Sequence, residues 1–167
     1  MSPLCQPSII SLKNKGISKM SEIYDCLRLD HQICFPLYAA ARKVTGRYTP
    51  FFKEIGITYT QYIVFMALWQ EDNQTVSEIC NKLYLDSGTL TPLLKKMEEK
   101  GWLTRTRSKE DERIVRITLT DKGWELREKC LELPARVGSC IHLSEEDAQN
   151  LYRILHLLLE EAIYDNE

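Results

Sequence analysis

The side chains of this chain that could carry redox or metal chemistry are its six cysteines. No C-x-x-C pair occurs among Cys5, Cys26, Cys34, Cys80, Cys130 and Cys140, so their spacing does not indicate structural zinc. The sequence has no signal-peptide pattern and no apolar stretch of about 18 residues, which predicts neither secretion nor a membrane span. We therefore expect a cytoplasmic protein with reduced thiols, in which a disulfide would act as a signal.

Cys34 lies two residues before Pro36, inside a segment with a helical spacing of apolar residues. Proline removes a helical hydrogen bond and clashes with the preceding turn, so we expect a kink or a helix restart near Cys34. A restart would put the sulfur at a helix N-terminus, where peptide dipoles favour the reactive thiolate. From the residues alone, a small buried hydrophobic side chain is an equally good interpretation.

His31 stands three residues before Cys34 and could share a helix face with it, which raises the possibility of a metal site. Two ligands do not complete such a site, and neither His142 nor His156 has a spacing that would add a third. We predict no metal and no cofactor.

Two short helical patterns occupy the middle of the chain and would position a second kind of site. The first begins at Thr75, where Glu78 completes a capping box. The second follows the N-cap residues Asp86 and Ser87 and ends at Gly101, which suits a left-handed C-cap. The spacing is typical of a helix-turn-helix.

The second of these helices has one apolar and one polar face. Its apolar face is Leu90, Leu93, Leu94 and Met97. Small hydroxyls and cations remain outside the core, and these suit the base edges and phosphates of a DNA major groove: Ser87, Thr89, Thr91, Lys95 and Lys96. An ordinary solvated helix would explain the lysines equally well.

The next segment favours the DNA-binding interpretation. Residues 103–107 and 113–119 alternate in character with a period of two around a charged tip, which predicts a β-hairpin. Arg105, Arg107 and Arg113 lie near one end, where a wing would meet the phosphate backbone. We predict a mainly α fold with a small β-hairpin wing, a winged helix-turn-helix.

The run LYLDSGTLTPLLKKME at residues 83–98, followed by Asp111 and Arg113, resembles the recognition helix and wing of the MarR family. Within that family, it is most similar to the repressors that sense organic hydroperoxides. The resemblance extends from about Leu29 to the C-terminal helix. It implies a two-fold dimer with intertwined terminal helices, in which Arg113 enters a groove or is held against Asp111.

The resemblance also implies roles for individual side chains around the cysteines. The segment ICFPLY at residues 33–38 is similar to the one that carries the family's peroxide-reactive cysteine, here Cys34, although Pro36 departs from the commoner aliphatic residue. Tyr48 and Tyr59 match the tyrosines that stabilise the thiolate. Cys140 has the context of a resolving cysteine, and Cys130 is the runner-up.

Domain boundaries follow from these patterns. Residues 1–20 are expected to be a mobile N-terminal extension, and residues 21–167 a single MarR-type winged-helix domain. Within it, residues 58–120 would bind DNA, while residues 21–57 and 121–167 would form a homodimer through surplus apolar surface. Two recognition helices in such a dimer read an inverted repeat.

The formal net charge of -2 excludes a uniformly basic nucleic-acid binder, so any DNA contact must be local. The leading hypothesis is a repressor that releases double-stranded DNA when an organic hydroperoxide oxidises Cys34. One alternative is a MarR-type repressor released by a small aromatic ligand. A thiol peroxidase is the alternative enzyme, but it would leave the wing unexplained, so we predict that the chain is not an enzyme.

Overall fold

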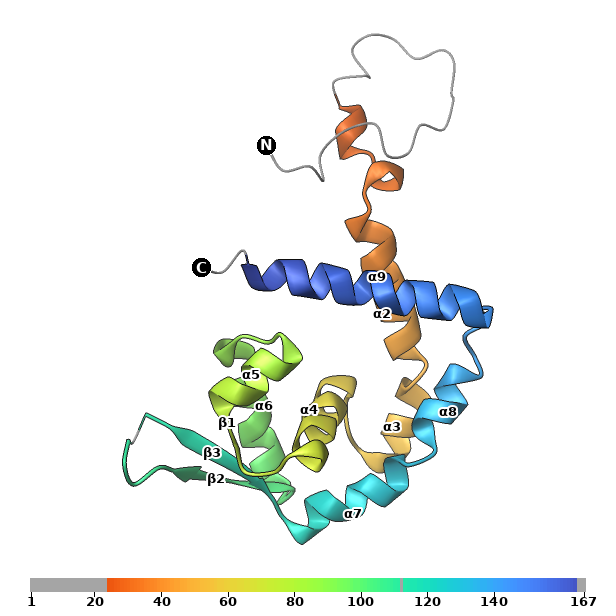
Figure 1. Cartoon of the computed structure of the whole chain (residues 1–167). Helices are drawn as coiled ribbons and strands as arrows, with labels where there is room; N and C mark the ends of the chain where they lie inside the picture. Colours follow the sequence, from red (N-terminus) through yellow and green to blue (C-terminus); the bar gives the residue numbers. More distant parts are fainter. Residues whose placement is uncertain (1–23, 112, 165–167) are drawn as a thin grey trace, which may run out of the picture. The chain divides into compact units, whose positions relative to one another are not determined.

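The computed structural model describes residues 24–111 and 113–164, with side chains described as far as residue 160. The extension expected over residues 1–20 lies outside the described residues. The chain divides into two compact units, residues 1–46 and residues 47–167. The architecture is mainly helical with one small sheet, which confirms the predicted fold class (Figure 1).

The first unit contains the helix restart that Pro36 predicts. Two single 3-10 turns, Asp25–Leu27 and Leu29–His31, precede helix α2, Cys34–Gly46. Arg28 and Gln32 are extended, so the helical pattern is interrupted twice before α2 begins. Pro36 is the third residue of α2, within the first turn, where backbone N–H groups have no helical partner in any case.

The second unit opens with helix α3, Thr49–Ile55, for which the sequence patterns gave no prediction. Gly56, at φ 78°, turns the chain into helix α4, Tyr59–Gln70. Thr58 and Gln61 form a capping box at the start of α4, with both reciprocal hydrogen bonds present. Helix α4 is apolar all round because it runs through the core.

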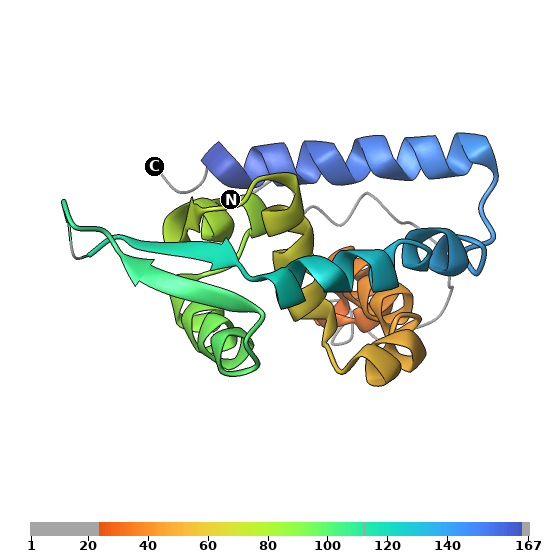
Figure 2. The same ribbon diagram turned by 90° about the horizontal axis from the view of Figure 1, so that it is seen from below.

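The helix-turn-helix and the wing follow as predicted. Helix α5, Val76–Leu83, carries the capping box of Thr75. Helix α6, Ser87–Glu99, is followed two residues later by Gly101, whose φ is 72°. Strands β2, Leu103–Arg107, and β3, Val115–Leu119, pair antiparallel as a hairpin that extends beyond α5 and α6 in both views (Figures 1 and 2).

The sheet differs from the prediction in two respects. A short strand β1, Gln74–Thr75, pairs with β3, so the strand order is β1-β3-β2 and β2 is an edge strand. The second hairpin strand begins at Val115, whereas the pattern predicted Arg113. The Arg113 N–H donates to Asp111 Oδ1 at 2.9 Å instead of entering the ladder, which keeps Arg113 in the tip.

The core lies where α4, α5, α6 and the sheet meet. Its fully buried large side chains come from each of these elements: Val64, Phe65, Leu68, Ile79, Leu90, Leu94, Met97, Leu103 and Ile117. This arrangement fixes the recognition helix and the base of the wing to one packed body.

Three helices complete the chain. Helix α7, Asp121–Cys130, is capped by Thr120, and α8, Leu133–Gly138, has Pro134 in its first turn. Helix α9, Glu145–Tyr164, is capped by Ser144, whose Oγ accepts from the Asp147 N–H at 3.1 Å. None of the helices in the described ranges is long and apolar enough to cross a membrane.

Candidate nucleic-acid interface and redox site

Cys34 is the first residue of α2 and is exposed. The turns before it carry a small ionic cluster, in which His31 Nδ1 lies 3.1 Å from Asp25 Oδ2 and Arg28 pairs with Asp30 at 2.7 Å. His31, three residues before Cys34, therefore has a carboxylate partner. The described residues contain no group of three or more His, Cys, Asp or Glu side chains that could hold a metal ion.

Tyr48 and Tyr59 come together in an aromatic cluster of the second unit. Their ring centroids are 5.4 Å apart, and each ring also lies within 6.4 Å of Phe52 and Tyr62. Burial raises the pKa of Tyr48 and of Tyr59, so both phenols keep their protons and can donate a hydrogen bond. Cys34 belongs to the first unit, so the predicted contact between its sulfur and these hydroxyls stays a prediction.

The cysteines of the second unit have different surroundings. Cys130 ends α7 in the core, and burial raises the pKa of its thiol to about 11. Cys80 on α5 is half-buried, and its pKa is raised by burial and then by the charge of Asp86. Cys140 follows α8 and is exposed, with its thiol 3.5 Å from the Arg136 carbonyl. Only Cys140 of these three is both exposed and outside the packed core.

The N-terminus of α6 is capped by Asp86, which organises the predicted base-reading residues. Asp86 accepts from the Thr89 N–H at 2.8 Å and from the Thr89 hydroxyl at 2.7 Å, and these bonds lower the pKa of its carboxyl. Ser87, Thr89 and Lys95 are exposed, and Thr91 is half-buried. The cap thus occupies the Thr89 hydroxyl in the absence of DNA.

The wing carries three arginines in unlike settings. Arg113 at the tip is 94% exposed and its Nε lies 3.4 Å from Asp111 Oδ1. Arg107 is also exposed. The Arg105 side chain is only 19% exposed and pairs with Glu98 of α6. Sequence patterns could not separate Arg105 from the other two, because all three alternate in the same way along the hairpin.

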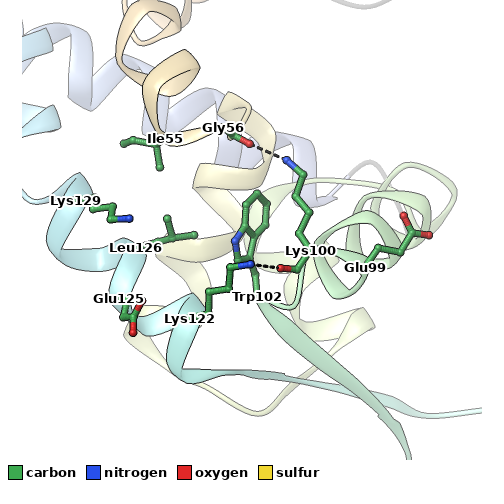
Figure 3. Close-up of a pocket in the computed structure, with 9 residues that line it drawn as sticks. All are labelled: Ile55, Gly56, Glu99, Lys100, Trp102, Lys122, Glu125, Leu126 and Lys129. Atoms are coloured by element: carbon green, nitrogen blue, oxygen red, sulfur yellow. Dashed lines mark hydrogen bonds between the residues drawn. The ribbon is translucent and has the colours of Figure 1, made fainter.

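A shallow cavity of about 490 Å³ lies where the end of α6 meets the α3–α4 turn and α7 (Figure 3). Lys100 Nζ donates to the Gly56 carbonyl at 2.8 Å and stands 4.4 Å from the ring centre of Trp102. Lys122 Nζ donates to the Lys100 carbonyl at 2.8 Å. These bonds connect the end of the recognition helix to the elements that lead into and out of the winged helix.

Comparison with known proteins adds an independent line of evidence. A family model for the transcriptional regulators SarA and Rot matches residues 47–130. The chain is 44% identical over 141 residues to the organic hydroperoxide resistance transcriptional regulator of Bacillus subtilis, which covers 84% of this chain and 96% of that protein.

Solved structures share the fold. Reduced AbfR bound to DNA has a TM-score of 0.67 and 37% identity, covering 83% of this chain and 98% of that chain. A disulfide-formed AbfR has a TM-score of 0.58 and 36% identity, with coverage of 84% and 99%. AbfR comes from Staphylococcus epidermidis. A structure of MarR, at 20% identity, has the same fold with a TM-score of 0.62 over 77% of this chain and 98% of that chain.

Proposed function

Because this chain belongs to the MarR family of transcriptional regulators, and within it to the group of the organic hydroperoxide resistance regulators, we propose that it is a repressor that senses organic hydroperoxides through Cys34 and then releases its operator. The observation that carries the proposal is the 44% identity to the Bacillus subtilis regulator over nearly that protein's whole length. Relatives of this kind are regulators and not enzymes.

The position of Cys34 supports its role as the sensor. As the first residue of α2, Cys34 is exposed, so an oxidant can reach its sulfur. The thiolate attacks one peroxide oxygen, an S–O bond forms, the O–O bond breaks, and an alcohol leaves after it takes up a proton. Cys34 is thereby oxidised to a sulfenic acid.

The half-buried phenols of Tyr48 and Tyr59 would supply hydrogen-bond donors for this chemistry. Burial keeps Tyr48 and Tyr59 protonated, so each O–H can donate to a thiolate at neutral pH. Phe52 and Tyr62 pack beside them, so this cluster of the second unit offers an apolar wall. An organic hydroperoxide with an apolar tail would fit such a wall better than hydrogen peroxide does.

We assign the resolving role to Cys140 of the second subunit. Its thiol would attack the sulfenic sulfur of Cys34, forming an S–S bond and releasing water. The exposure of Cys140 and the burial of Cys130 support this order of preference. The two Cα atoms must come within about 7 Å, so helices that hold them further apart have to move. AbfR, which has been solved both reduced on DNA and in a disulfide form, offers a precedent for such a pair of states.

The DNA contacts in this proposal come from α6 and the wing. The residues of α6 that would face the major groove are Ser87, Thr89, Thr91 and Lys95. In the wing, Arg107 would contact the phosphate backbone, and Arg113, which is oriented by Asp111, would enter the adjacent groove. In a two-fold dimer these elements would occur twice and read an inverted repeat.

The terminal helices supply the apolar surface for that dimer. Leu151, Ile154 and Leu158 recur on one face of α9 and are 46%, 46% and 37% exposed, and Leu155 between them is half-buried. Helix α2 also has no buried residue. A second copy of the chain would cover both faces.

The test is a DNA-binding titration with reduced protein and with protein treated with cumene hydroperoxide. Wild type should bind when reduced, lose DNA when oxidised, and run as a covalent dimer on a non-reducing gel. Cys34→Ser should bind DNA under both conditions and form no covalent dimer. Cys80→Ser, the matched control at a half-buried cysteine, should behave like wild type.

The resolving step is tested with the same assay. Cys140→Ser should form the sulfenic acid but no covalent dimer, and Cys130→Ser should still give the dimer. The opposite result would assign the resolving role to Cys130. Release of DNA from Cys34→Ser on oxidation would contradict the sensor role of Cys34.

A further inference from the structure

We propose that Glu98 is a positioning residue for DNA binding, whose carboxylate holds the first strand of the wing against the recognition helix. In this role Arg105 is the counter-charge of Glu98 and not a phosphate contact. The inference rests on the proposed DNA-binding function and adds a device that sets the angle between α6 and the hairpin.

The first observation is a backbone hydrogen bond at the edge of the sheet. Strand β2 is an edge strand, so its outward N–H groups have no strand partner. The Arg105 N–H donates instead to Glu98 Oε1 at 3.0 Å. A side chain from the last turn of α6 thus takes the place of a neighbouring strand.

The second observation concerns the guanidinium of the same residue. Arg105 Nη1 lies 3.6 Å from Glu98 Oε2, so both carboxylate oxygens contact one residue. Arg105 stands opposite the fully buried Ile117 in the ladder, and its Nε is buried without a hydrogen-bond partner among the described residues. A guanidinium held in this way would have to leave Glu98 to reach a phosphate.

The third observation is the place of Glu98 in its own helix. An acid in the last turn of a helix is disfavoured by the helix dipole. Negative charge on a DNA-binding element also repels phosphate. Neither local rule favours Glu98, and among the described residues its carboxylate contacts Arg105 through a hydrogen bond and an ion pair.

Because the connection between α6 and β2 is short, these contacts can set the angle between the helix and the hairpin. Only Lys100, Gly101 and Trp102 separate the helix from the strand, and Gly101 bends the chain with φ 72°. Packing of the fully buried Leu103 fixes the start of β2 to the core, but the rest of β2 lies beyond it. The Glu98 contacts fix a second point beyond the turn, so α6 and the hairpin move as one body and present both DNA-contacting surfaces at a set angle.

The proposal predicts an effect opposite in sign to simple electrostatics. Glu98→Ala removes a negative charge, yet it should weaken binding on the order of tenfold, because only a fraction of the molecules would hold the wing in the competent position. Glu99→Ala is the matched control: it removes the same charge from the neighbouring, exposed residue. It should leave affinity unchanged or raise it slightly.

Affinity is measured by fluorescence anisotropy of full-length protein on a duplex of about 30 base pairs, selected from a random pool by wild type. The slope of log affinity against log salt counts phosphate contacts. Glu98→Ala should lower this slope as the wing contacts are lost. Arg105→Met should do the same, and the double variant should be no worse than either single one, because both changes remove one device.

Two results would overturn the proposal. One is Glu98→Ala binding as tightly as Glu99→Ala with an unchanged salt slope. The other is Arg105→Met weakening binding while Glu98→Ala strengthens it, which would make Arg105 a direct phosphate contact.

Hydrogen exchange of the free protein separates this inference from the proposed function. The Arg105 amide should be protected in wild type and exchange faster in Glu98→Ala, whereas the Ile117 amide in the central strand should stay protected in both. Failure of wild type to bind any duplex would contradict the DNA-binding function alone. An Arg105 amide that exchanges equally fast in both proteins would contradict the Glu98 contact.

Discussion

The winged helix and the terminal helix α9 differ in how completely one chain buries them. In the winged helix, α4, α5 and α6 each contribute fully buried side chains, and the N-termini of all three helices are capped by side chains. In the described part of α9, every side chain is exposed except Leu155, which is half-buried. The apolar residues of α9 are nevertheless as numerous as those of a core helix.

This difference indicates where a second subunit would bind. The winged helix, which is the DNA-reading part of the proposed repressor, is complete within one chain because the apolar faces of its elements cover each other. The faces of α9 remain open, and exposed leucines and isoleucines in one stripe are typical of an interface. In the proposed mechanism, the cysteine chemistry joins two chains through these incomplete ends, so a redox change there can alter the spacing of two otherwise rigid DNA-reading parts.

The largest expected effect is at α9. Leu158→Asp would place a carboxylate from each subunit in the proposed α9 interface, and each unpaired buried charge costs about 3–5 kcal/mol. The variant should be a monomer or an aggregate at micromolar concentration, as measured by light scattering. Gln149→Asp adds the same charge on the opposite face of α9 and should remain a dimer. Dimeric Leu158→Asp would show that α9 is not the interface.

A change in the winged helix should act without any dependence on subunit concentration. Leu94 is fully buried, and its truncation in Leu94→Ala should lower the free energy of unfolding by about 2–5 kcal/mol. Urea unfolding at two protein concentrations tests this. The loss attributed to Leu94 should be the same at both, while Leu158→Asp should alter the concentration dependence itself. Tolerance of Leu94→Ala would contradict the packed core.

Alkaline pH should weaken the same core. Burial raises the pKa of Tyr62 to about 12 and that of Cys130 to about 11, above their ordinary values of 10.0 and 9.0. A raised pKa contributes stability that is complete below the ordinary value and is lost as pH rises toward the folded value, here between pH 9 and 12. The loss should be about 2–3 kcal/mol for Tyr62.

Urea unfolding at neutral pH and at a pH of about 10.5 measures the first part of this loss, about 1 kcal/mol for Tyr62. Tyr62→Phe should reduce the difference between the two conditions, whereas Tyr152→Phe, a change at an exposed tyrosine of α9, should leave it as in wild type. Equal pH dependence in wild type and Tyr62→Phe would remove Tyr62 as the cause.

The tip of the wing differs from the packed part of the winged helix, because Arg113 and Lys109 are exposed there. Arg113 is 94% exposed and is oriented by Asp111, so we expect it to contribute to the free energy of DNA binding and not to that of folding. Arg113→Ala should weaken DNA binding by about 1–3 kcal/mol and lower the salt slope by about 1, with no change in unfolding. Lys109→Ala on the same exposed tip is the comparison. Affinity equal to wild type for Arg113→Ala would refute the wing contact.

The sequence predicts most of the winged helix because its signals are local. Thr75 and Asp86 each cap the helix that the sequence pattern indicates, and Gly101 follows α6 in the expected left-handed conformation. Strand β1 was not predicted, because a two-residue strand is too short to show a periodic pattern. It forms only by pairing with β3, about forty residues later in the chain.

The candidate site is less predictable because its residues act through partners far along the chain. Nothing in the local pattern separates Arg105 from Arg107, since the difference between them is the Glu98 carboxylate of the preceding helix. The burial of Cys130 and the exposure of Cys140 likewise follow from tertiary packing. The helix start at Cys34 could be predicted, because its signal, Pro36, is only two residues away.

The smallest effect concerns a strained residue inside the otherwise complete winged helix. Tyr84 ends α5 with φ 52°, a left-handed conformation that glycine adopts without cost and other residues do not. The bonds from the Tyr84 N–H to the Asn81 carbonyl and from the Leu85 N–H to the Cys80 carbonyl impose this conformation. Because Tyr84 is 57% exposed, the loss of its side chain should remove little packing.

Comparison of glycine and alanine at this position isolates the strain. Tyr84→Gly should be more stable than Tyr84→Ala by about 1 kcal/mol, as measured by thermal unfolding. At Asn81, an exposed position inside α5, the order should reverse, with Asn81→Ala more stable than Asn81→Gly by about 0.5–1 kcal/mol. If alanine were the more stable residue at both positions, the turn of the helix-turn-helix would relax on substitution. The contrast between a rigid DNA-reading part and open terminal helices would then be weaker than the burial pattern indicates.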